Sequence, residues 1–408
     1  MDSWASTDTL DQAAVEYLSS PTAHFAPWSF FDTIRSAAPV YRTSIGPVLI
    51  SDYEGVGNLL TDERWSVERA YNSMIDTLFD RPEVAHIFLS GIGKRDNPTH
   101  LRLRRMLTKW FTPRSIRAWS SLIDEIVLEL LDRFDGKDEV DLMNDFALPI
   151  PQRLMSAILG VPYEDRDQLQ EWGLAVINRP IDGGSDQSRR TLTVAMEELC
   201  EYLRKLILDR SKNPGDDLLS DLIQTREGSD KLSEHELIAI CAELISGGHE
   251  TTSNLIANGS VLLMRNPRER ERMMADQDLV AGAVEESLRM EPPTMYSHPR
   301  YATEAMEMSG VEINTGDIAY GMLGSANRDP KRFPEPDRFI IDRPANQHQS
   351  FAAGMHFCLG APLARYEAIE AFRALFERYP NVQTVSDEIE WKQHMRMHGP
   401  SRLPVRLS

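Results

Sequence analysis

One long apolar pattern, between Ser233 and Met264, constrains the fold of this 408-residue chain more than any other feature. Ser233 and Glu236 have the spacing of a capping box that starts a helix, and Asn266-Pro267 follows the last apolar position. At 1.5 Å per residue, about 32 residues form a helix of roughly 48 Å, long enough to cross a whole molecule. We therefore predict a mainly helical protein organised around a central helix.

Shorter elements are predicted on both sides of this helix. Apolar residues at helical spacing predict helices over 115–134, 146–159, 167–177, 192–208, 278–290 and 359–379. β-branched residues around Gly46 predict a hairpin over 39–51, and short strands are expected at 302–308, 311–313 and 318–322. We expect one domain over 1–408, mainly α with a minor antiparallel β region, whose strands lie mainly in 35–55, in 300–345 and at the C-terminus. Gly183-Gly184 marks a loop.

Composition limits the classes of partner and compartment. The net charge of −19, from 44 basic and 63 acidic residues, argues against a nucleic-acid partner. Three cysteines cannot form a disulfide framework, so a reducing cytoplasm is the simplest location. Residues 1–17 do not have the pattern of a signal peptide, and no apolar run approaches 18 residues. We expect a cytoplasmic protein that does not span a membrane.

A cysteine loop lies before the last predicted helix. Cys358 is preceded by Gly354 and followed by Gly360, which stands at the start of an apolar helical run. A buried thiolate is costly unless a metal or the amides of a helix start compensate its charge. The pattern indicates a thiolate held against a metal whose opposite face stays free; the alternative is a buried structural cysteine.

The central helix contains an unusual segment, Gly247-Gly248-His249-Glu250-Thr251-Thr252. Two glycines weaken a helix, and a threonine hydroxyl can bond a carbonyl one turn earlier. We therefore predict a local opening of the helix at this segment. Taken alone, a helical Gly-Gly pair more often indicates close packing.

The cysteine loop resembles the haem-ligand loop of the cytochrome P-450 monooxygenases, and six positions carry the match: Phe351, Gly354, His356, Cys358, Gly360 and Arg365. The resemblance covers nearly the full chain and is to the soluble bacterial type. It implies the P-450 fold and haem b (heme b, iron protoporphyrin IX), with Cys358 as the ligand to the metal. Ala352, Asn97 and Thr99 depart from the residues that are commoner in the family.

The resemblance also implies roles for residues outside the loop. Glu250 would supply protons and Thr251 would stabilise the activated oxygen. Four side chains match the family's donors to the haem propionates: His100, Arg104, Arg300 and His356. For His100 the alternative is an ordinary surface position.

A charge constellation is expected to support the cysteine loop. Glu286 and Arg289 lie three residues apart, so they share one face of a helix. Such a pair is usually a solvated surface bridge, but here it resembles the family's core salt bridge. The third member would be Arg338.

The resemblance places the substrate pocket against 71–89, 172–178, 294–298, 395–397 and the central helix. Its candidate contacts are Phe88, Ser246, Gly247, Met295, Tyr296 and Met397, with His298 as a further polar group. Many of these positions could equally be plain core. Glu243 lies on the same face of the central helix as Thr251, at a position where the family usually has an apolar residue. It either binds an amine or hydroxyl of the substrate or pairs with an Arg or Lys from an overlying helix.

The expected activity is insertion of one oxygen atom from O2 into a medium-sized, largely apolar substrate by C–H hydroxylation, as part of secondary metabolism. Electrons would come from NAD(P)H through an acidic ferredoxin or flavodoxin, which would dock on a monomer at a basic cluster: Arg102, Arg105, Lys109 and Arg114. Two alternatives remain. One is a P-450 that carries out epoxidation, demethylation or C–C coupling in natural-product biosynthesis. The other is a non-catalytic haem-thiolate binding or sensor protein.

Overall fold

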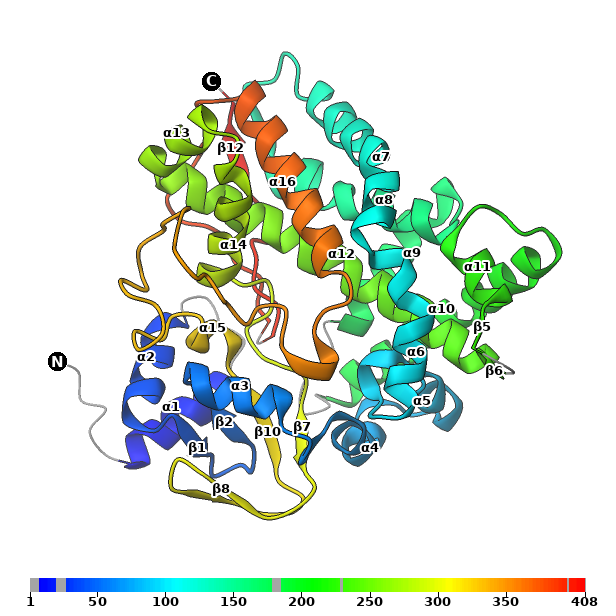
Figure 1. The fold of residues 1–408 in the computed structure, drawn as a ribbon, viewed down its shortest axis with the longest axis vertical. Coiled ribbons are helices and arrows are strands. Elements are labelled where there is room, and N and C mark those ends of the chain that lie inside the picture. Colours follow the sequence, from blue (N-terminus) through cyan, green and yellow to red (C-terminus); the bar gives the residue numbers. More distant parts are fainter. Residues whose placement is uncertain (1–6, 20–26, 178–184, 228–229, 395, 408) are drawn as a thin grey trace.

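The fold is dominated by helices, with a small β region beside the N-terminal helices (Figure 1). The computed structural model describes residues 7–19, 27–177, 185–227, 230–394 and 396–407. Its helices are α1 Thr7–Ser19, α2 Trp28–Ala37, α3 Tyr53–Thr61, α4 Val67–Leu78, α5 Pro82–Leu89, α6 Thr99–Thr108, α7 Pro113–Asp132, α8 Pro149–Leu159, α9 Arg166–Ile177, α10 Asp186–Lys212, α11 Leu218–Gln224, α12 Glu234–Arg265, α13 Pro267–Ala275, α14 Leu279–Met290, α15 Leu323–Ala326 and α16 Ala361–Arg378. The prediction of a mainly helical protein is confirmed.

The strands are short: β1 Val40–Arg42, β2 Val48–Ile50, β3 Trp65–Ser66, β4 Glu139–Asp141, β5 Arg226–Glu227, β6 Asp230–Lys231, β7 Arg300–Ala302, β8 Met306–Met308, β9 Val311–Ile313, β10 Ile318–Gly321, β11 Gln383–Thr384 and β12 Pro404–Arg406. The largest sheet has the order β1-β2-β10-β7-β3. Its pairings are antiparallel except for β2 with β10, which is parallel. This sheet therefore joins a hairpin from the start of the chain to strands from its last third.

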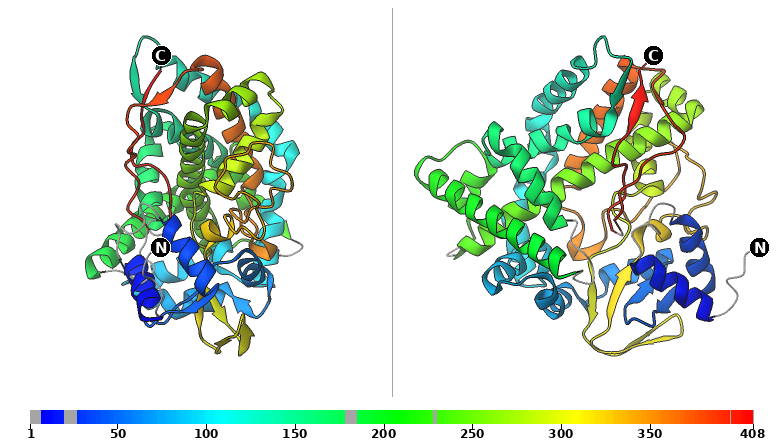
Figure 2. Two further views of the ribbon diagram at one scale, coloured as in Figure 1. Left: turned by 90° about the vertical axis from the view of Figure 1, so that its left-hand side faces the viewer. Right: turned by 180° about the vertical axis from the view of Figure 1, so that it is seen from behind.

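Helix α12 forms the centre of the molecule and crosses it from one side to the other (Figure 2). Ser233 and Glu236 form the predicted capping box, and the helix ends before Pro267. The predicted local opening at Gly247–Thr252 is wrong, because α12 is continuous through this segment. The threonine bond that motivated it is present: the hydroxyl of Thr251 donates to the carbonyl oxygen of Gly247 at 2.6 Å.

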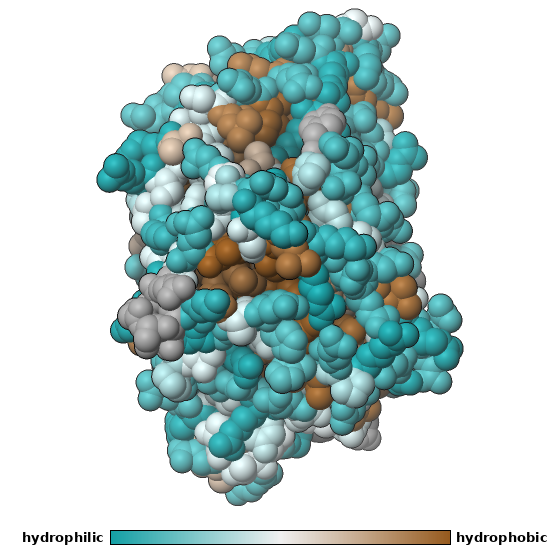
Figure 3. Space-filling model, turned by 90° about the vertical axis from the view of Figure 1, so that its right-hand side faces the viewer, coloured by the Kyte–Doolittle hydropathy of each residue, from teal (hydrophilic) through white to brown (hydrophobic). Residues whose placement is uncertain are grey.

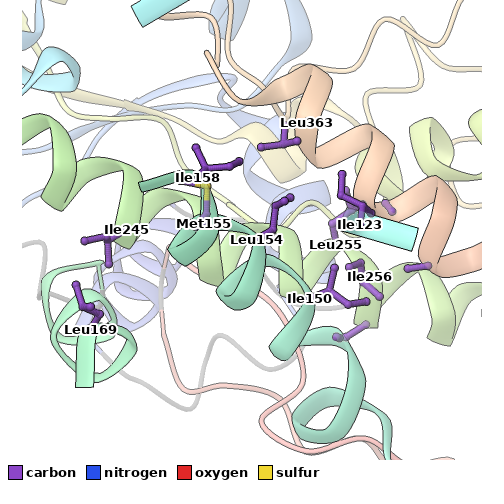
Figure 4. Close-up of a cluster of buried hydrophobic side chains, with 14 of the residues drawn as sticks. Ile123, Ile150, Leu154, Met155, Ile158, Leu169, Ile245, Leu255, Ile256 and Leu363 are labelled. Carbon is purple, nitrogen blue, oxygen red and sulfur yellow. The ribbon is translucent and has the colours of Figure 1, made fainter. Parts of the chain in front are cut away.

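The main core lies around α12, where side chains of neighbouring helices meet on several of its faces. Figure 4 shows Ile245, Leu255 and Ile256 of α12 among apolar side chains from α7, α8, α9 and α16. Because α12 is buried over most of its length, its polar residues must find partners inside the protein. This requirement becomes important at the functional site.

Some predicted bounds differ from those observed. The predicted helix 192–208 extends over 186–212, and the predicted strand 302–308 is split by a turn between β7 and β8. Gly183-Gly184 lies outside the described residues. Among the described helices, none is both long and apolar enough to cross a lipid bilayer. The face shown in Figure 3 has apolar areas set among mostly hydrophilic side chains.

A buried ion network joins α14 to the chain segment that follows α15. Both Glu286 and Arg289 are fully buried, and the guanidinium of Arg289 binds the two carboxylate oxygens of Glu286 at 2.8 Å each. The third member is Arg343, whose Nε lies 3.0 Å from Glu286 and whose side chain is 4% exposed. The prediction of Arg338 is wrong: its side chain is exposed and pairs with Glu335, while its carbonyl oxygen accepts from Arg289.

We predict that Glu286→Gln lowers the free energy of unfolding by about 3–5 kcal/mol, because it leaves two buried guanidinium groups without their anion. Urea unfolding followed by circular dichroism measures this loss. Glu335→Gln is the matched control, since its exposed pair with Arg338 contributes at most about 1 kcal/mol. Equal stability of the two variants would contradict the structural role of the network.

Candidate functional site

Cys358 lies at the wall of an internal cavity, just before α16. Its N–H donates to the carbonyl oxygen of Phe351 at 2.9 Å, which closes the loop that holds the thiol. Burial raises the pKa of the Cys358 thiol, while the N–H of Gly360 and the guanidinium of Arg104 act in the opposite direction. These two influences do not compensate the burial, so a cation bound to the sulfur would be needed to hold it as a thiolate.

Backbone conformation in the loop explains why Gly354 is a glycine and shows the cost of having alanine at position 352, where the family often has glycine. Gly354 has a φ of +65°, and a Cβ there would lie 2.9 Å from the carbonyl oxygen of Leu60. Ala352 also has a positive φ, 58°, which costs a residue with a side chain about 1–2 kcal/mol. At Gly360 a Cβ would meet no described atom within 4 Å, so this side of the loop faces the cavity.

The cavity has two adjoining parts of about 250 and 270 Å³ that share Thr251, His298, Cys358 and several other lining residues. Five of the predicted substrate contacts line it: Glu243, Ser246, Gly247, Tyr296 and Met397. Within the described residues, Phe88 and Met295 do not line either part. Both are buried in the surrounding core, where Phe88 packs under Lys94 and Met295 packs near Gly324.

The four predicted propionate donors gather around one edge of the cavity. The rings of His100 and His356 lie 4.6 Å apart, and Arg104 reaches the carbonyl oxygen of Met355 at 3.5 Å. Arg300 and His356 line the cavity itself. Burial, with help from neighbouring cations, lowers the pKa of His356 to about 2 and that of His100 to about 4.

Two of these donors have buried atoms without a hydrogen-bond partner among the described residues: Nη1 of Arg300 and Nε2 of His356. Burial also lowers the pKa of Arg300 to about 10, as expected for a cation that lacks an anion. A carboxylate at this edge would satisfy both groups. The thiol, the cavity and these cationic and neutral donors together fit a flat metal complex with acidic side groups, such as haem.

Thr251 and Glu250 are placed differently relative to the cavity. Thr251 lines both parts of it. Glu250 is 1% exposed and is not among the described residues that line the cavity. Its Oε1 instead lies 3.1 Å from Nζ of Lys392, a partner that the sequence did not indicate, because the two residues are 142 positions apart.

Glu243 is held by an ion pair with Lys94, which belongs to the short 3-10 turn Ile92–Lys94 before α6. The N–H of Gly93 donates to the same carboxylate at 3.1 Å. A Cβ at Gly91 would lie 2.4 Å from it, so the glycine permits the close approach. The structure therefore favours the alternative of a lysine partner, although this lysine comes from a turn and not from an overlying helix.

His298 forms a second polar group in the cavity wall. Nδ1 of the ring lies 2.6 Å from the hydroxyl of Tyr71, and Nε2 lies 3.0 Å from Nη2 of Arg396. A guanidinium can only donate, so Nε2 accepts and Nδ1 donates to Tyr71. Arg396 and His298 line both parts of the cavity; Arg396 lies in the predicted wall segment 395–397 but was not itself predicted as a contact.

The predicted basic cluster is partly neutralised. Arg102 pairs with Glu236, and Lys109 pairs with Asp221 at 2.8 Å. Arg105 and Arg114 are exposed. Two apolar side chains near the cysteine loop are also exposed, Leu101 on α6 and Phe357 beside Cys358.

Comparison with known proteins gives one consistent family. A model of the cytochrome P-450 family matches residues 26–399. The chain is 35% identical to the polyketide biosynthesis cytochrome P-450 PksS of Bacillus subtilis (strain 168), over 94% of this chain and 96% of that protein. It is 36% identical to mycinamicin IV hydroxylase/epoxidase of Micromonospora griseorubida, over 88% of each. The crystal structure of P-450BioI with an acyl carrier protein ligated to hexadec-9Z-enoic acid superposes with a TM-score of 0.88 and 34% identity, covering 95% of this chain and 100% of that chain.

We predict that Lys94→Met lowers the free energy of unfolding by about 1–3 kcal/mol, because it leaves the Glu243 carboxylate, whose side chain is 16% exposed, without its cation. Lys94→Met combined with Glu243→Leu should recover most of the loss, since two apolar residues replace the pair at little net cost. Urea unfolding measures both. Lys205→Met, which removes an exposed pair with Glu201, is the control. A double variant no more stable than the single one would show that the two groups are not coupled.

Proposed function

Because this chain belongs to the cytochrome P-450 family, whose members named above include monooxygenases, we propose that it hydroxylates a C–H bond of a medium-sized, largely apolar organic substrate. One atom of O2 enters the substrate, and the other leaves as water after taking up two protons and two electrons. We propose NAD(P)H as the electron source, acting through a separate ferredoxin or flavodoxin. The observation that carries the proposal is the thiol of Cys358 at the wall of a cavity that Thr251 also lines.

We propose that the residues around the cavity hold haem b. Cys358 would bind the iron, and Arg300, His356, His100 and Arg104 would bind the propionates, whose carboxylates fit the unpartnered atoms of Arg300 and His356. Phe351, Gly354 and Gly360 shape the loop around the thiol. When bound, haem supplies the redox chemistry that cleaves dioxygen.

The protein's own contribution is to place protons and substrate. The Thr251 hydroxyl already donates to Gly247, so its oxygen remains able to accept a hydrogen bond inside the cavity. Glu250 is the nearest acid along α12 and would renew the proton at this hydroxyl. The cavity wall keeps the substrate's C–H bond close to the reacting centre and excludes bulk water.

Two pairs of polar side chains in the cavity wall suggest how a substrate is oriented. The pair of Glu243 with Lys94 and the pair of His298 with Arg396 both line the cavity. Each presents charged donors to a hydroxyl, carbonyl or carboxylate of the substrate. Ser246, Gly247, Tyr296 and Met397 would contact the apolar remainder. The relatives named for polyketide and mycinamicin chemistry favour a natural product or an acyl chain as the substrate.

Epoxidation is a second candidate reaction, favoured by the name of the hydroxylase/epoxidase relative. An alkene placed where the C–H bond would lie accepts the same oxygen atom. Product analysis with a substrate that carries both groups distinguishes the two reactions.

We predict that the reduced protein treated with carbon monoxide shows the far-red-shifted Soret band of an axial thiolate. Cys358→Ser should remove this band, because a hydroxyl does not replace the thiolate as an electron donor to iron. Cys200→Ser is the matched control, since Cys200 is a buried cysteine in α10 outside the cavity lining. An unchanged band in Cys358→Ser would refute the proposed function.

The docking face for the electron donor would lie around α6 and the cysteine loop. Exposed Arg105 and Arg114 supply positive charge on a protein of net charge −19, and exposed Phe357 and Leu101 supply apolar contact area. An acidic ferredoxin or flavodoxin matches this chemistry.

We predict that raising the ionic strength from about 0.05 to about 0.5 M slows reduction by an acidic ferredoxin. Over this range the Debye length falls from about 14 to about 4 Å, so the attraction between the two proteins is screened. Arg105→Gln with Arg114→Gln should slow it at low salt and weaken its salt dependence. Stopped-flow reduction measures both effects. Reduction that does not respond to salt would remove the electrostatic part of the docking proposal.

A further inference from the structure

Three polar side chains form a stripe on one buried face of α12. Glu250, Asn254 and Asn258 are spaced by four residues, so they lie one above the other along the helix. Each is 0–1% exposed. Polar groups buried this deeply are costly unless they have hydrogen-bond partners, so the stripe needs an explanation.

A turn before β12, whose described residues are 391–394 and 396–400, covers this stripe. Trp391 stacks on His398 with 4.4 Å between ring centroids, and the N–H of Lys392 donates to the carbonyl oxygen of Gly399 at 2.9 Å. A Cβ at Gly399 would lie 2.3 Å from Oδ1 of Asn254, so the turn is pressed directly against the helix. The C-terminal coil runs beside α12 in Figure 2.

Lys392 is the cation of the stripe. Its Nζ lies 3.1 Å from Oε1 of Glu250 and 2.8 Å from Oδ1 of Asn254. Its side chain is 21% exposed, whereas that of Glu250 is 1% exposed. Lys392 therefore connects the buried acid to the outside of the protein.

Nδ2 of Asn258 donates to the carbonyl oxygens of Glu291 and His398 at 3.0 and 3.1 Å. Three polar atoms of the stripe have no hydrogen-bond partner in the described part of the chain: Glu250 Oε2, Asn254 Nδ2 and Asn258 Oδ1. They offer an acceptor, a donor and an acceptor in sequence along the helix. Such groups are normally satisfied by buried water molecules, which exchange protons readily.

We propose that Lys392 is the positioning residue for the proton donor Glu250: it binds Oε1, compensates the charge of the carboxylate and leaves Oε2 to exchange protons with water along the stripe. A proton from water binds Oε2 and forms the carboxylic acid. The same proton then leaves towards the hydroxyl of Thr251, and Glu250 returns to the carboxylate bound to Lys392. Two such passages supply the two protons of each turnover, with no net change in the protein.

The inference rests on the proposed function, but its first test does not require turnover. In the haem-loaded protein, Lys392→Met removes the cation from a buried carboxylate, which favours the neutral acid. The infrared difference spectrum between Lys392→Met and Lys392→Met/Glu250→Gln should therefore contain the carbonyl band of a protonated carboxylic acid. The difference between wild type and Glu250→Gln should contain a carboxylate band instead.

The second test follows coupling, the amount of oxygenated product formed per NAD(P)H consumed. Lys392→Met should lower the coupling about tenfold and raise hydrogen peroxide release. Positioned proton transfer contributes roughly 10²–10⁴-fold to a rate, so a tenfold loss corresponds to partial disturbance of the proton donor. Lys392→Arg keeps the charge and should restore most of the coupling. Gln393→Met, an exposed neighbour in the same turn, should behave as wild type and controls for disturbance of the turn.

Each outcome decides the matter. A protonated-acid band and uncoupling in Lys392→Met, both reversed in Lys392→Arg, support the proposal. Uncoupling without the band, or equal uncoupling in Gln393→Met, would show a structural role for the turn and overturn it. A positive infrared result in a protein that forms no oxygenated product would leave the ion pair established and refute the proposed function instead.

Discussion

The whole site depends on the burial of one thiol. Burial alone opposes ionisation of Cys358, and the nearby helix start and Arg104 do not compensate it. A cation on the sulfur removes the conflict, and the same cavity presents unpartnered donors for acidic groups at Arg300 and His356. The buried thiol and the unpartnered donors therefore both fit a bound metal complex that carries acidic groups.

Buried charges outside the cavity lining anchor the segment that leads to the loop carrying this thiol. The carboxylate of Glu286 gathers two guanidinium groups and the N–H of Ile340, while Arg289 reaches three carbonyl oxygens beyond α15. These contacts tie α14 to the long irregular segment that leads into the cysteine loop. Irregular backbone of this length needs such fixed anchors, because it has no ladder of its own hydrogen bonds.

The sequence predicted what depends on short spacing. The capping box at Ser233 and the helical periodicity of α12 and α16 involve residues a few positions apart, and each was confirmed. Partners far apart in sequence were missed. Lys94 and Lys392 meet Glu243 and Glu250 across 149 and 142 positions, and no pattern in one sequence links them.

Arg338 and the expected opening of α12 failed for a different reason. Arg338 and Arg343 are five positions apart in a segment without periodicity, so spacing could not tell which one faces Glu286. The glycines of α12 were expected to loosen it, but helices packed on several faces hold the ladder intact. In α12, tertiary packing overrides local preference.

The parallel pairing of β2 with β10 has a consequence for how the protein is made. Arg35 and Tyr53, near the start of the chain, bond to Ser325 and Asp329, which follow 290 and 276 residues later. The first helices and hairpin therefore have no complete set of neighbours until most of the polypeptide has left the ribosome. Closure of such long loops is slow, so the strand edges of the N-terminal part stay unpaired while the rest of the chain is synthesised.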